Sequence, residues 1–389
     1  MSAALTAPPS DVVSIVVNGV QWGGWESVQI SRGIETVPSC FSLSGTELFP
    51  GLAGATTVDI PITAPCQIKI GTDLVITGYV DTGERSYTPE SHEIYFTGRS
   101  KLSDLVDCSG FTQTWQLQNL TLLTIAQTIC KPFGITVTAP DGDTPPIVNI
   151  SVVLTETGWE LLEEVARWMG KLIYDGPDGG LIIAALGDET HTSGIQEGVN
   201  VQEARVSLNA QEMYSQIGAV YSDTATLTDG AGTTQIAFVQ NAQATAGNYF
   251  KPRADGSARF RPLLIVAEQG PAQDQLVPRR IQWEMGRRFG RSQVVYATVD
   301  SWRDSDGNLW TPNWLLSVDL PSLKFAKTTL LITNVTYIKD MQGTRAELTL
   351  MPPVAMAPMP VAPLSFDPAL AEASSSTTGA QTSPTSSGS

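Results

Sequence analysis

The chain has 389 residues, a length that predicts two or three domains with buried cores rather than one small module. It carries 23 Lys and Arg against 39 Asp and Glu, and this net charge of −16 disfavours nonspecific binding to nucleic acid or to anionic membranes. Apolar residues make up 42% of the chain and charged residues only 16%, which favours strands covered by other strands or by partner chains.

The N-terminal residues, MSAALTAPPSDVV, lack the charged and then apolar pattern of a secretion signal, and no 18 uncharged apolar residues run together. We therefore expect synthesis in the cytosol and no membrane span. The four cysteines are widely spaced, form no CxxC pair and have no His at zinc-finger spacing, so free buried thiols are expected. They are Cys40, Cys66, Cys108 and Cys130.

Residues 12 to 99 alternate apolar and polar side chains in six short runs separated by Gly, Pro and Asn. Short strands at this spacing are typical of a β-barrel or a β-sandwich. The pattern then changes to two helices, over residues 101 to 109 and 119 to 134. The second has Leu122, Ile125 and Ile129 on one face and is stopped by the Pro and Gly among its last four residues.

Residues 155 to 187 predict a helix followed by a β-hairpin. Thr157 and Glu160 have the spacing of a capping box, in which each side chain accepts a hydrogen bond from the other residue's backbone N–H. Gly170 is placed to end the helix in a left-handed turn. The apolar stripe of the helix is Trp159, Leu162, Ala166 and Met169.

Two strands, KLIYD and GLIIAAL, follow this helix and are joined by the turn GPDGG. Glu163 and Glu164 are adjacent on the helix and therefore point in different directions. We assign them to its solvated side rather than to a catalytic pair.

Residues 201 to 240 return to β alternation, and a helix is predicted over residues 274 to 292. This helix and its approach form a basic cluster on an acidic chain. Two interpretations stay open: contact with an anion or acidic partner, or a solvated helix whose arginines pair internally with Asp and Glu. The cluster comprises Lys251, Arg253, Arg259, Arg261, Arg279, Arg280, Arg287, Arg288 and Arg291.

Residues 293 to 352 are again β, and they echo the first β segment. LVITGYVD (74 to 81) and LLITNVTYI (330 to 338) share one pattern about 256 positions apart, each between an alternating strand and a closing strand. Two diverged copies of one barrel would leave this trace. Chance similarity between β patterns is the alternative. Beyond Pro352 the chain is rich in proline and then in Ser and Thr, and we expect this tail to be disordered.

A His-based nucleophilic site has only two candidate bases, His92 and His191, and neither lies near a GxSxG elbow. No phosphate-binding GxxxxGK[ST], no GxGxxG after a strand and no HExxH motif is present. A carboxylate pair of the glycosidase kind stays open, because its two acids need proximity only in space.

The stretch DSWRDSDGNLWTPNWLLSVDLPS, residues 300 to 322, combines aspartates, an Asp-Gly pair and tryptophans. As a calcium loop centred on Gly307 it would have Trp302 at its first position and Asn313 at its twelfth, which is a poor ligand set. A hairpin with Asp306 and Gly307 at its turn needs nothing unusual. We therefore expect a hairpin whose aspartates are solvated and whose tryptophans pack.

Four motifs in order, GWESVQISRGIETVPSCFSLSGTE, GRSKLSDLVDCS, GNLWTPN and LLITNVTY, resemble the baseplate hub protein of Mu-like contractile-tail bacteriophages over roughly residues 12 to 360. The resemblance implies a homotrimer in which each subunit carries two barrels similar to the tail-tube fold. Three subunits then form a ring of six barrels that adapts the sixfold tail tube to the threefold spike.

The fold implied is α+β and mainly β: two tail-tube-like antiparallel β-barrel domains, a mixed α/β module between them and a disordered C-terminal tail. The expected domains are a first barrel over 10–100, a helix-rich α/β module over 101–198, a second barrel over 199–240 and 292–352, an insertion with the Arg-rich helix over 241–291, and a Pro-rich strap with a Ser/Thr tail over 353–389.

The partners implied are further copies of the chain, the central spike protein, the tail tube or tube-initiator protein, and baseplate wedge proteins. DNA only passes through the lumen, which the net charge predicts to be acidic and repulsive to phosphate. The implied location is the tail baseplate of the virion, assembled in the bacterial host cytoplasm. The resemblance carries over no catalytic, cofactor or metal residue, and no enzyme activity is expected.

Two other functions remain to be distinguished from a hub. A tail-tip cell-wall hydrolase predicts a cleft with paired carboxylates. A carbohydrate-binding module predicts an exposed aromatic platform among Trp22, Trp25, Trp302, Trp310 and Trp314.

Overall fold

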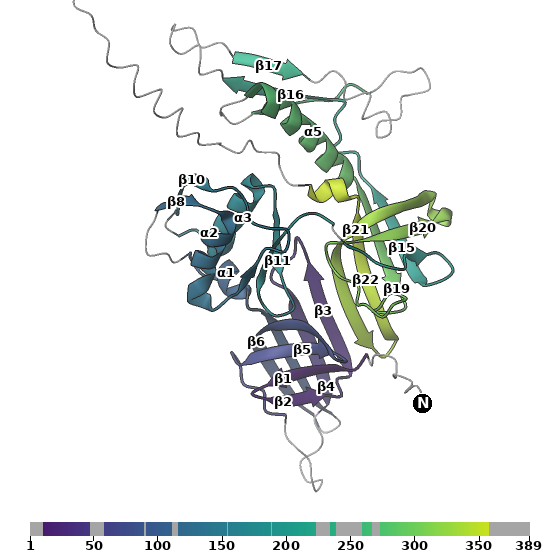
Figure 1. The fold of residues 1–389 in the computed structure, drawn as a ribbon. Coiled ribbons are helices and arrows are strands. Elements are labelled where there is room, and N and C mark those ends of the chain that lie inside the picture. Colours follow the sequence, from purple (N-terminus) through teal and green to yellow (C-terminus); the bar gives the residue numbers. More distant parts are fainter. Residues whose placement is uncertain are drawn as a thin grey trace, which may run out of the picture.

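The computed structural model describes residues 11–46, 58–88, 91–110, 116–153, 155–187, 189–222, 234–238, 259–266 and 273–357. Its main feature is a long, mainly antiparallel sheet that forms two halves side by side (Figure 1). A helical module lies beside the first half, and a smaller sheet with one long helix lies beyond the second (Figure 1). The mainly β architecture predicted from the sequence is thus confirmed. The predicted Ser/Thr tail lies outside the described residues.

The first half of the sheet is built from seven strands in the order β3-β4-β7-β6-β5-β1-β2. Along β4 and β7 every second side chain is buried, because alternate residues of a strand point to opposite faces. The strands are β1 (Val13–Val17), β2 (Val20–Gly23), β3 (Ser27–Gly33), β4 (Cys40–Thr46), β5 (Pro65–Ile70), β6 (Asp73–Tyr87) and β7 (His92–Ser100).

The second half has the order β15-β19-β22-β21-β20, and two short strands, β13 and β14, pair in parallel with β20. The strands are β13 (Glu189–Thr190), β14 (Ile195–Gln196), β15 (Val201–Leu208), β19 (Gln293–Val299), β20 (Trp314–Leu320), β21 (Phe325–Asp340) and β22 (Gly343–Met351). A short 3-10 helix, η3 (Pro321–Leu323), follows β20.

The two halves are joined by antiparallel pairing of β21 with β3. One hydrophobic core runs through both halves, so side chains such as Ile30 and Leu43 of the first half belong to the same cluster as Trp302 and Tyr337 of the second. Burial of this continuous apolar surface stabilises the joint at roughly 25 cal/mol per Å² removed from water.

The two halves also share one internal arrangement. Strands β3, β4, β7, β6 and β5 occupy the same order as β15, β19, β22, β21 and β20. Both long strands carry a register shift at the same place, as expected of two copies of one unit. The matched pairs are Val80 with Gly98 and Ile332 with Leu350 before the shift, and Thr82 with Thr97 and Asn334 with Thr349 after it.

The sequence echo identified the right strands, β6 and β21, but in the wrong register. Equivalent residues of these strands are 252 positions apart, from Val80 to Ile332. The echo aligns residues 256 positions apart, from Leu74 to Leu330. The difference of four positions keeps the inward and outward alternation of a strand, so an apolar pattern alone does not reveal it.

The helical module has its own core between three helices and two small sheets. The three helices predicted here are confirmed, and so is the capping box, since the Thr157 and Glu160 side chains each accept from the other's backbone N–H and Gly170 takes a left-handed φ of 68°. The elements are α1 (Ser103–Asp107), β8 (Gln116–Leu120), α2 (Leu122–Cys130), η1 (Lys131–Phe133), β9 (Val137–Thr138), β10 (Ile147–Ser151), α3 (Gly158–Trp168), β11 (Leu172–Asp175) and β12 (Leu181–Ala184).

A buried carboxylate fixes this module to the first half. Asp175, at the end of β11, accepts from the backbone N–H of Ser39 at 2.8 Å and from its hydroxyl at 2.9 Å. Two hydrogen bonds to one buried carboxylate set both the distance and the angle between the two parts.

The remaining elements are β16 (Gln216–Ser222), β17 (Thr234–Phe238), β18 (Pro262–Val266), α5 (Gln273–Arg291) and η4 (Pro353–Met356). β16 is the central strand of a separate three-stranded sheet and pairs with both β17 and β18, and Ile217 of β16 packs on Ile281 of α5. The prediction that 199–240 belongs wholly to the second barrel is therefore corrected: these two strands belong with the insertion. Alternation predicts a strand but not its sheet.

Candidate functional site

The loop between β19 and β20 contains the stretch that looked most like a ligand site. A single bridge, Arg303 with Leu309, closes it, and Gly307 takes a φ of 87° at the turn. The predicted turn is present, but its flanks are not regular strands. Trp302 and Trp310 are buried, as expected of packing residues.

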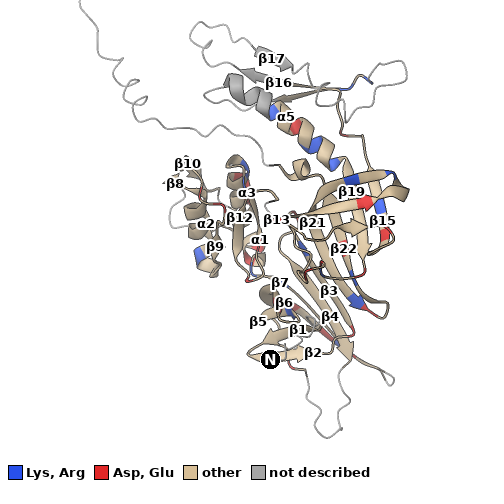
Figure 2. Cartoon of the chain, turned by 45° about the vertical axis from the view of Figure 1, so that its right-hand side comes forward, with Lys and Arg blue, Asp and Glu red and all other residues tan. Residues whose placement is uncertain are grey.

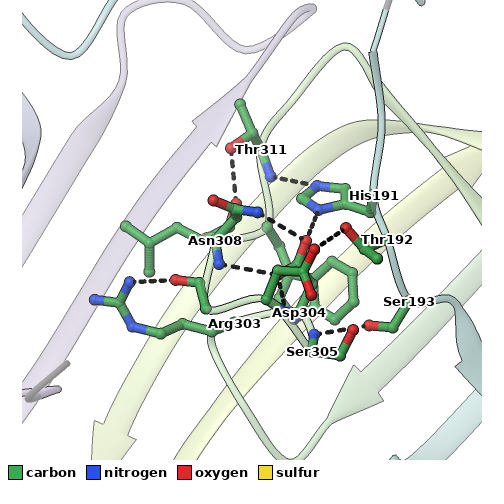
Figure 3. A network of polar contacts seen from close by, with 12 residues as sticks. His191, Thr192, Ser193, Arg303, Asp304, Ser305, Asn308 and Thr311 are labelled. Atoms are coloured by element: carbon green, nitrogen blue, oxygen red, sulfur yellow. Dashed lines mark hydrogen bonds and ion pairs between the residues drawn. The ribbon is translucent and has the colours of Figure 1, made fainter. Parts of the chain in front are cut away.

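Asp304 corrects the expectation that the aspartates of this loop are solvated. Its side chain is fully buried, and one carboxylate oxygen accepts from the backbone N–H groups of Asp306 and Asn308 at 3.0 and 2.9 Å (Figure 3). The other oxygen lies 2.9 Å from Nδ1 of His191. The carboxylate therefore closes the loop from inside and fixes it to the segment that carries β13.

His191 is the second half of this network. Its Nε2 accepts from the backbone N–H of Thr311 at 3.2 Å, so the proton of the neutral ring sits on Nδ1 and is donated to Asp304. Burial holds the pKa of His191 below its ordinary value, although contact with Asp304 opposes this shift. The rings of Trp310 and Trp314 lie 4.8 and 4.7 Å from the imidazole ring.

The hydrogen-bonding positions of this network are taken up by groups of the chain itself. The acceptor positions of Asp304 are occupied by backbone N–H groups and by His191. Within the part of the chain that the structure describes, no three His, Cys, Asp or Glu side chains cluster as metal ligands would. His92, the other candidate base, lies at the start of β7 in the first half. The His191–Asp304 pair is thus a structural lock.

Arg303 connects this loop with the first half of the sheet. Its guanidinium forms ion pairs with Asp11 at 3.1 Å and Asp73 at 2.7 Å, and its side chain is only 8% exposed. Both carboxylates are more than a third exposed, so solvent screens these pairs, but they hold the loop against the first half. Arg303 therefore supports the joint between the halves.

The other residues singled out in the sequence also have structural roles. Glu163 and Glu164 are exposed, and Glu163 pairs with Arg167 one helical turn away. All four cysteines are free; Cys66 and Cys130 are buried, as expected, whereas Cys40 and Cys108 are exposed. The tryptophans give no exposed platform: Trp25, Trp302 and Trp310 are buried, and Trp22 and Trp314 are half-buried.

Basic and acidic residues lie along α5 (Figure 2), and the contacts of its described arginines favour internal pairing. Arg288 contacts Glu284 at 2.7 Å and Arg291 pairs with Glu35 of the loop after β3. Arg287 lies over the ring of Trp283, 5.3 Å from its centroid. Lys251 and Arg253 lie outside the described residues.

Two open strand edges are the sites that sequence reasoning missed. Among the described residues, the distal part of β6, residues 82–87, pairs with β7 on one side only, and β15 beyond the bridge of Val201 with Glu197 pairs with β19 on one side only. The first edge arises because the 15-residue β6 follows the 6-residue β5, so the distal part of the longer strand extends beyond its neighbour.

The arrangement defines the class of protein: a β scaffold of two equivalent sheet halves with a helical module. None of the described helices has the length and apolar character needed to cross a membrane. Three family models match it: the N-terminal domain of Mu phage baseplate assembly protein GpP-like over residues 12–100, the second domain of baseplate hub protein gp44-like over 103–185, and the fourth domain of Mu phage baseplate assembly protein GpP over 274–359.

Whole-chain comparisons agree with these models. The chain is 28% identical over 350 residues to baseplate hub protein gp44 of Escherichia phage Mu, covering 88% of both proteins. A crystal structure of the 43 kDa tail protein of prophage MuSo2 from Shewanella oneidensis is 30% identical, with a TM-score of 0.73 over 89% of this chain and 99% of that one. A crystal structure of a tail protein from Neisseria meningitidis MC58 is 18% identical, with a TM-score of 0.69 over 89% of this chain and 98% of that one. The chain belongs to the Mu-like family of phage baseplate hub proteins, as the sequence motifs predicted.

Proposed function

We propose that the protein is the structural hub of a contractile-tail baseplate and that it acts as a homotrimer. Its three copies form a ring of six barrels between the sixfold tail tube and the threefold central spike. The tail tube or its initiator, the spike and the baseplate wedge proteins are the partners. The site of action is the virion baseplate, assembled in the host cytoplasm, and the protein is not an enzyme.

The observation that carries this proposal is the equivalence of the two halves of the sheet. A chain with two copies of one unit presents two similar surfaces, so three chains present six. A trimer therefore has approximate sixfold symmetry toward one neighbour and true threefold symmetry toward another. An adaptor between a sixfold tube and a threefold spike needs both.

The outward face of the continuous sheet supports a role in DNA passage. On β3, β4, β7, β15, β19 and β22 this face is rich in Ser, Thr and Gln. With β6 and β21 included, it carries the basic residues Arg99, Arg205 and Arg345 and the acidic residues Glu84, Glu93, Glu203, Asp340 and Glu347, so its net charge is negative. We propose that this face lines the channel, where its excess negative charge repels the phosphate backbone.

The mass of the purified full chain in solution, measured by light scattering with and without a candidate spike protein, tests the hub. We expect three times the mass of one chain, and a further increase when a trimeric spike is added. A protein that stays monomeric at micromolar concentration and does not join the spike would contradict the proposal. Turnover of purified peptidoglycan would instead support the hydrolase alternative.

A further inference from the structure

Two strand edges on different halves of the sheet have no strand partner among the described residues. One is the distal part of β6, residues 82–87, and the other is the outer edge of β15. Both include large exposed apolar side chains, with Tyr87 76% and Leu208 71% exposed. An open edge presents unsatisfied N–H and C=O groups and invites another strand to pair with it.

The same chain shows how such an edge is closed. The distal part of β21, which is equivalent to the distal part of β6, pairs antiparallel with β3. In that joint Thr336 lies opposite Ser31, and their hydroxyl groups hydrogen-bond at 3.2 Å. Ile338 lies opposite Gln29 in the same joint.

β3 and β15 are equivalent by their own pairing. Gln29 pairs with Ser42, and Arg205 pairs with Tyr296, at matching positions of β4 and β19. β15 is thus the counterpart of β3 with its outer edge left open. The two open edges of one chain are the two sides of the joint that β21 and β3 form internally.

We propose that β6 of one copy pairs antiparallel with β15 of a second copy, in the register of the internal joint between β21 and β3. This inference rests on the proposed homotrimer and names its contact. The register places residues of one copy opposite residues of the next as follows: Gly83 with Leu208, Glu84 with Ser207, Arg85 with Val206, and Ser86 with Arg205.

The side chains on these edges fit this register. Glu84 lies directly opposite the hydroxyl group of Ser207. Arg205 is its diagonal neighbour, close enough for the two long side chains to meet. Leu208 faces Gly83, where a Cβ would lie 2.9 Å from Ile62 and 3.0 Å from the buried ring of Phe96, so only glycine fits this position of the edge. In the internal joint the residues equivalent to Glu84 and Arg205 are uncharged, Thr336 and Gln29.

The contact is head-to-tail, because each copy offers one β6 edge and one β15 edge. A repeated head-to-tail contact closes into a ring when its rotation divides a full turn, and otherwise grows into a filament. If the rotation that relates neighbouring copies equals the rotation that relates the two halves of one chain, the six halves of three chains follow one another by equal rotations. Each such contact closes one β6 edge and one β15 edge.

Engineered disulfides test the register in the full-length protein. On a background with exposed Cys40 and Cys108 replaced by Ser, we pair Glu84→Cys with Ser207→Cys, and separately Ser86→Cys with Arg205→Cys. Directly opposed residues lie about 4.5–5.5 Å apart between Cα atoms, within disulfide reach. We expect covalent dimers and trimers on non-reducing gels after mild oxidation, reversed by reductant.

The matched controls exchange partners: Glu84→Cys with Arg205→Cys, and Ser86→Cys with Ser207→Cys. A shift of two residues along one strand puts the Cα atoms about 8 Å apart, beyond disulfide geometry. Cross-links in these controls or in single-cysteine variants would overturn the register. A trimer whose directly opposed pairs give no cross-link would overturn it as well. Either result leaves the hub proposal intact. A monomeric wild-type chain would instead contradict the hub proposal.

The charge pair gives an independent test that needs no cysteine. Glu84→Arg and Arg205→Glu should each weaken assembly about tenfold, and the double variant should recover most of the loss, because opposite charges are restored. The populations of monomer and trimer are measured by mass photometry across nanomolar concentrations. If the loss of the double variant equals the sum of the losses of the two single variants, the two side chains do not meet.

Discussion

The buried carboxylate of Asp304 allows a sharp prediction from one substitution, Asp304→Asn. The change keeps the shape of the side chain, and the remaining oxygen can still accept from the backbone N–H groups of Asp306 and Asn308. The new NH₂ group, however, faces the Nδ1–H of His191. If the ring moves its proton to Nε2, that proton faces the N–H of Thr311 instead.

One buried donor is therefore left without an acceptor in either tautomer. An unsatisfied buried donor costs about 1–3 kcal/mol, and the hydrogen bond to the charged carboxylate is removed as well. We therefore expect the free energy of unfolding to fall by about 3 kcal/mol. For a unit of 150–250 residues this lowers the melting temperature by roughly 6–12 °C. Trp310 and Trp314 contact the imidazole ring, so tryptophan fluorescence reports unfolding at this place.

Asp306→Asn is the matched control. Asp306 is exposed, and its carboxylate accepts from the hydroxyl of Thr192 at 2.6 Å. An exposed contact of this kind contributes less than about 1 kcal/mol. Equal destabilisation by the two substitutions would refute the view that the Asp304–His191 pair locks the loop.

Two further predictions concern pH and close backbone packing. The pKa of His191 is lowered in the folded protein, so on acidification the unfolded chain takes up a proton first. The free energy of unfolding should therefore fall as pH drops below about 6.5, by up to about 1.4 kcal/mol per pH unit. His191→Asn should abolish this part of the slope in denaturant titrations between pH 5 and 7.5. Gly78→Ala should lower the free energy of unfolding by about 3 kcal/mol or more, because a Cβ at Gly78 would lie 1.8 Å from the carbonyl oxygen of Arg99. Gly45→Ala is the control: the nearest atom to a Cβ there is 3.6 Å away, so thermal melts should show a clearly smaller loss.

Local features of the fold could be predicted from the sequence because they rest on neighbouring residues. The capping box of Thr157 and Glu160, the left-handed Gly170 and the apolar face of α2 each need only a few adjacent positions. Their energetics are those of a helix end and a helix face, which short patterns encode directly.

Long-range features were missed or misplaced for the same reason. The hydrogen bond between His191 and Asp304 joins residues 113 positions apart, and no spacing rule connects them. Both residue types are usually exposed, so a solvated position was the natural expectation for each. The assignment of β16 to the second barrel failed likewise, because alternation shows that a strand has two faces but not which strand lies beside it.

The two joints of the proposed ring face different thermodynamic demands, which explains their different side chains. The joint between β21 and β3 lies within one chain, so its halves are held together covalently and lose little freedom when they meet. Hydroxyl and amide side chains such as Thr336, Ser31 and Gln29 suffice there. The joint between copies must offset the translational and rotational freedom that free molecules lose on association. A charge pair between Glu84 and Arg205 raises the rate of encounter and selects one register, so divergence of the two halves placed charge where assembly is bimolecular.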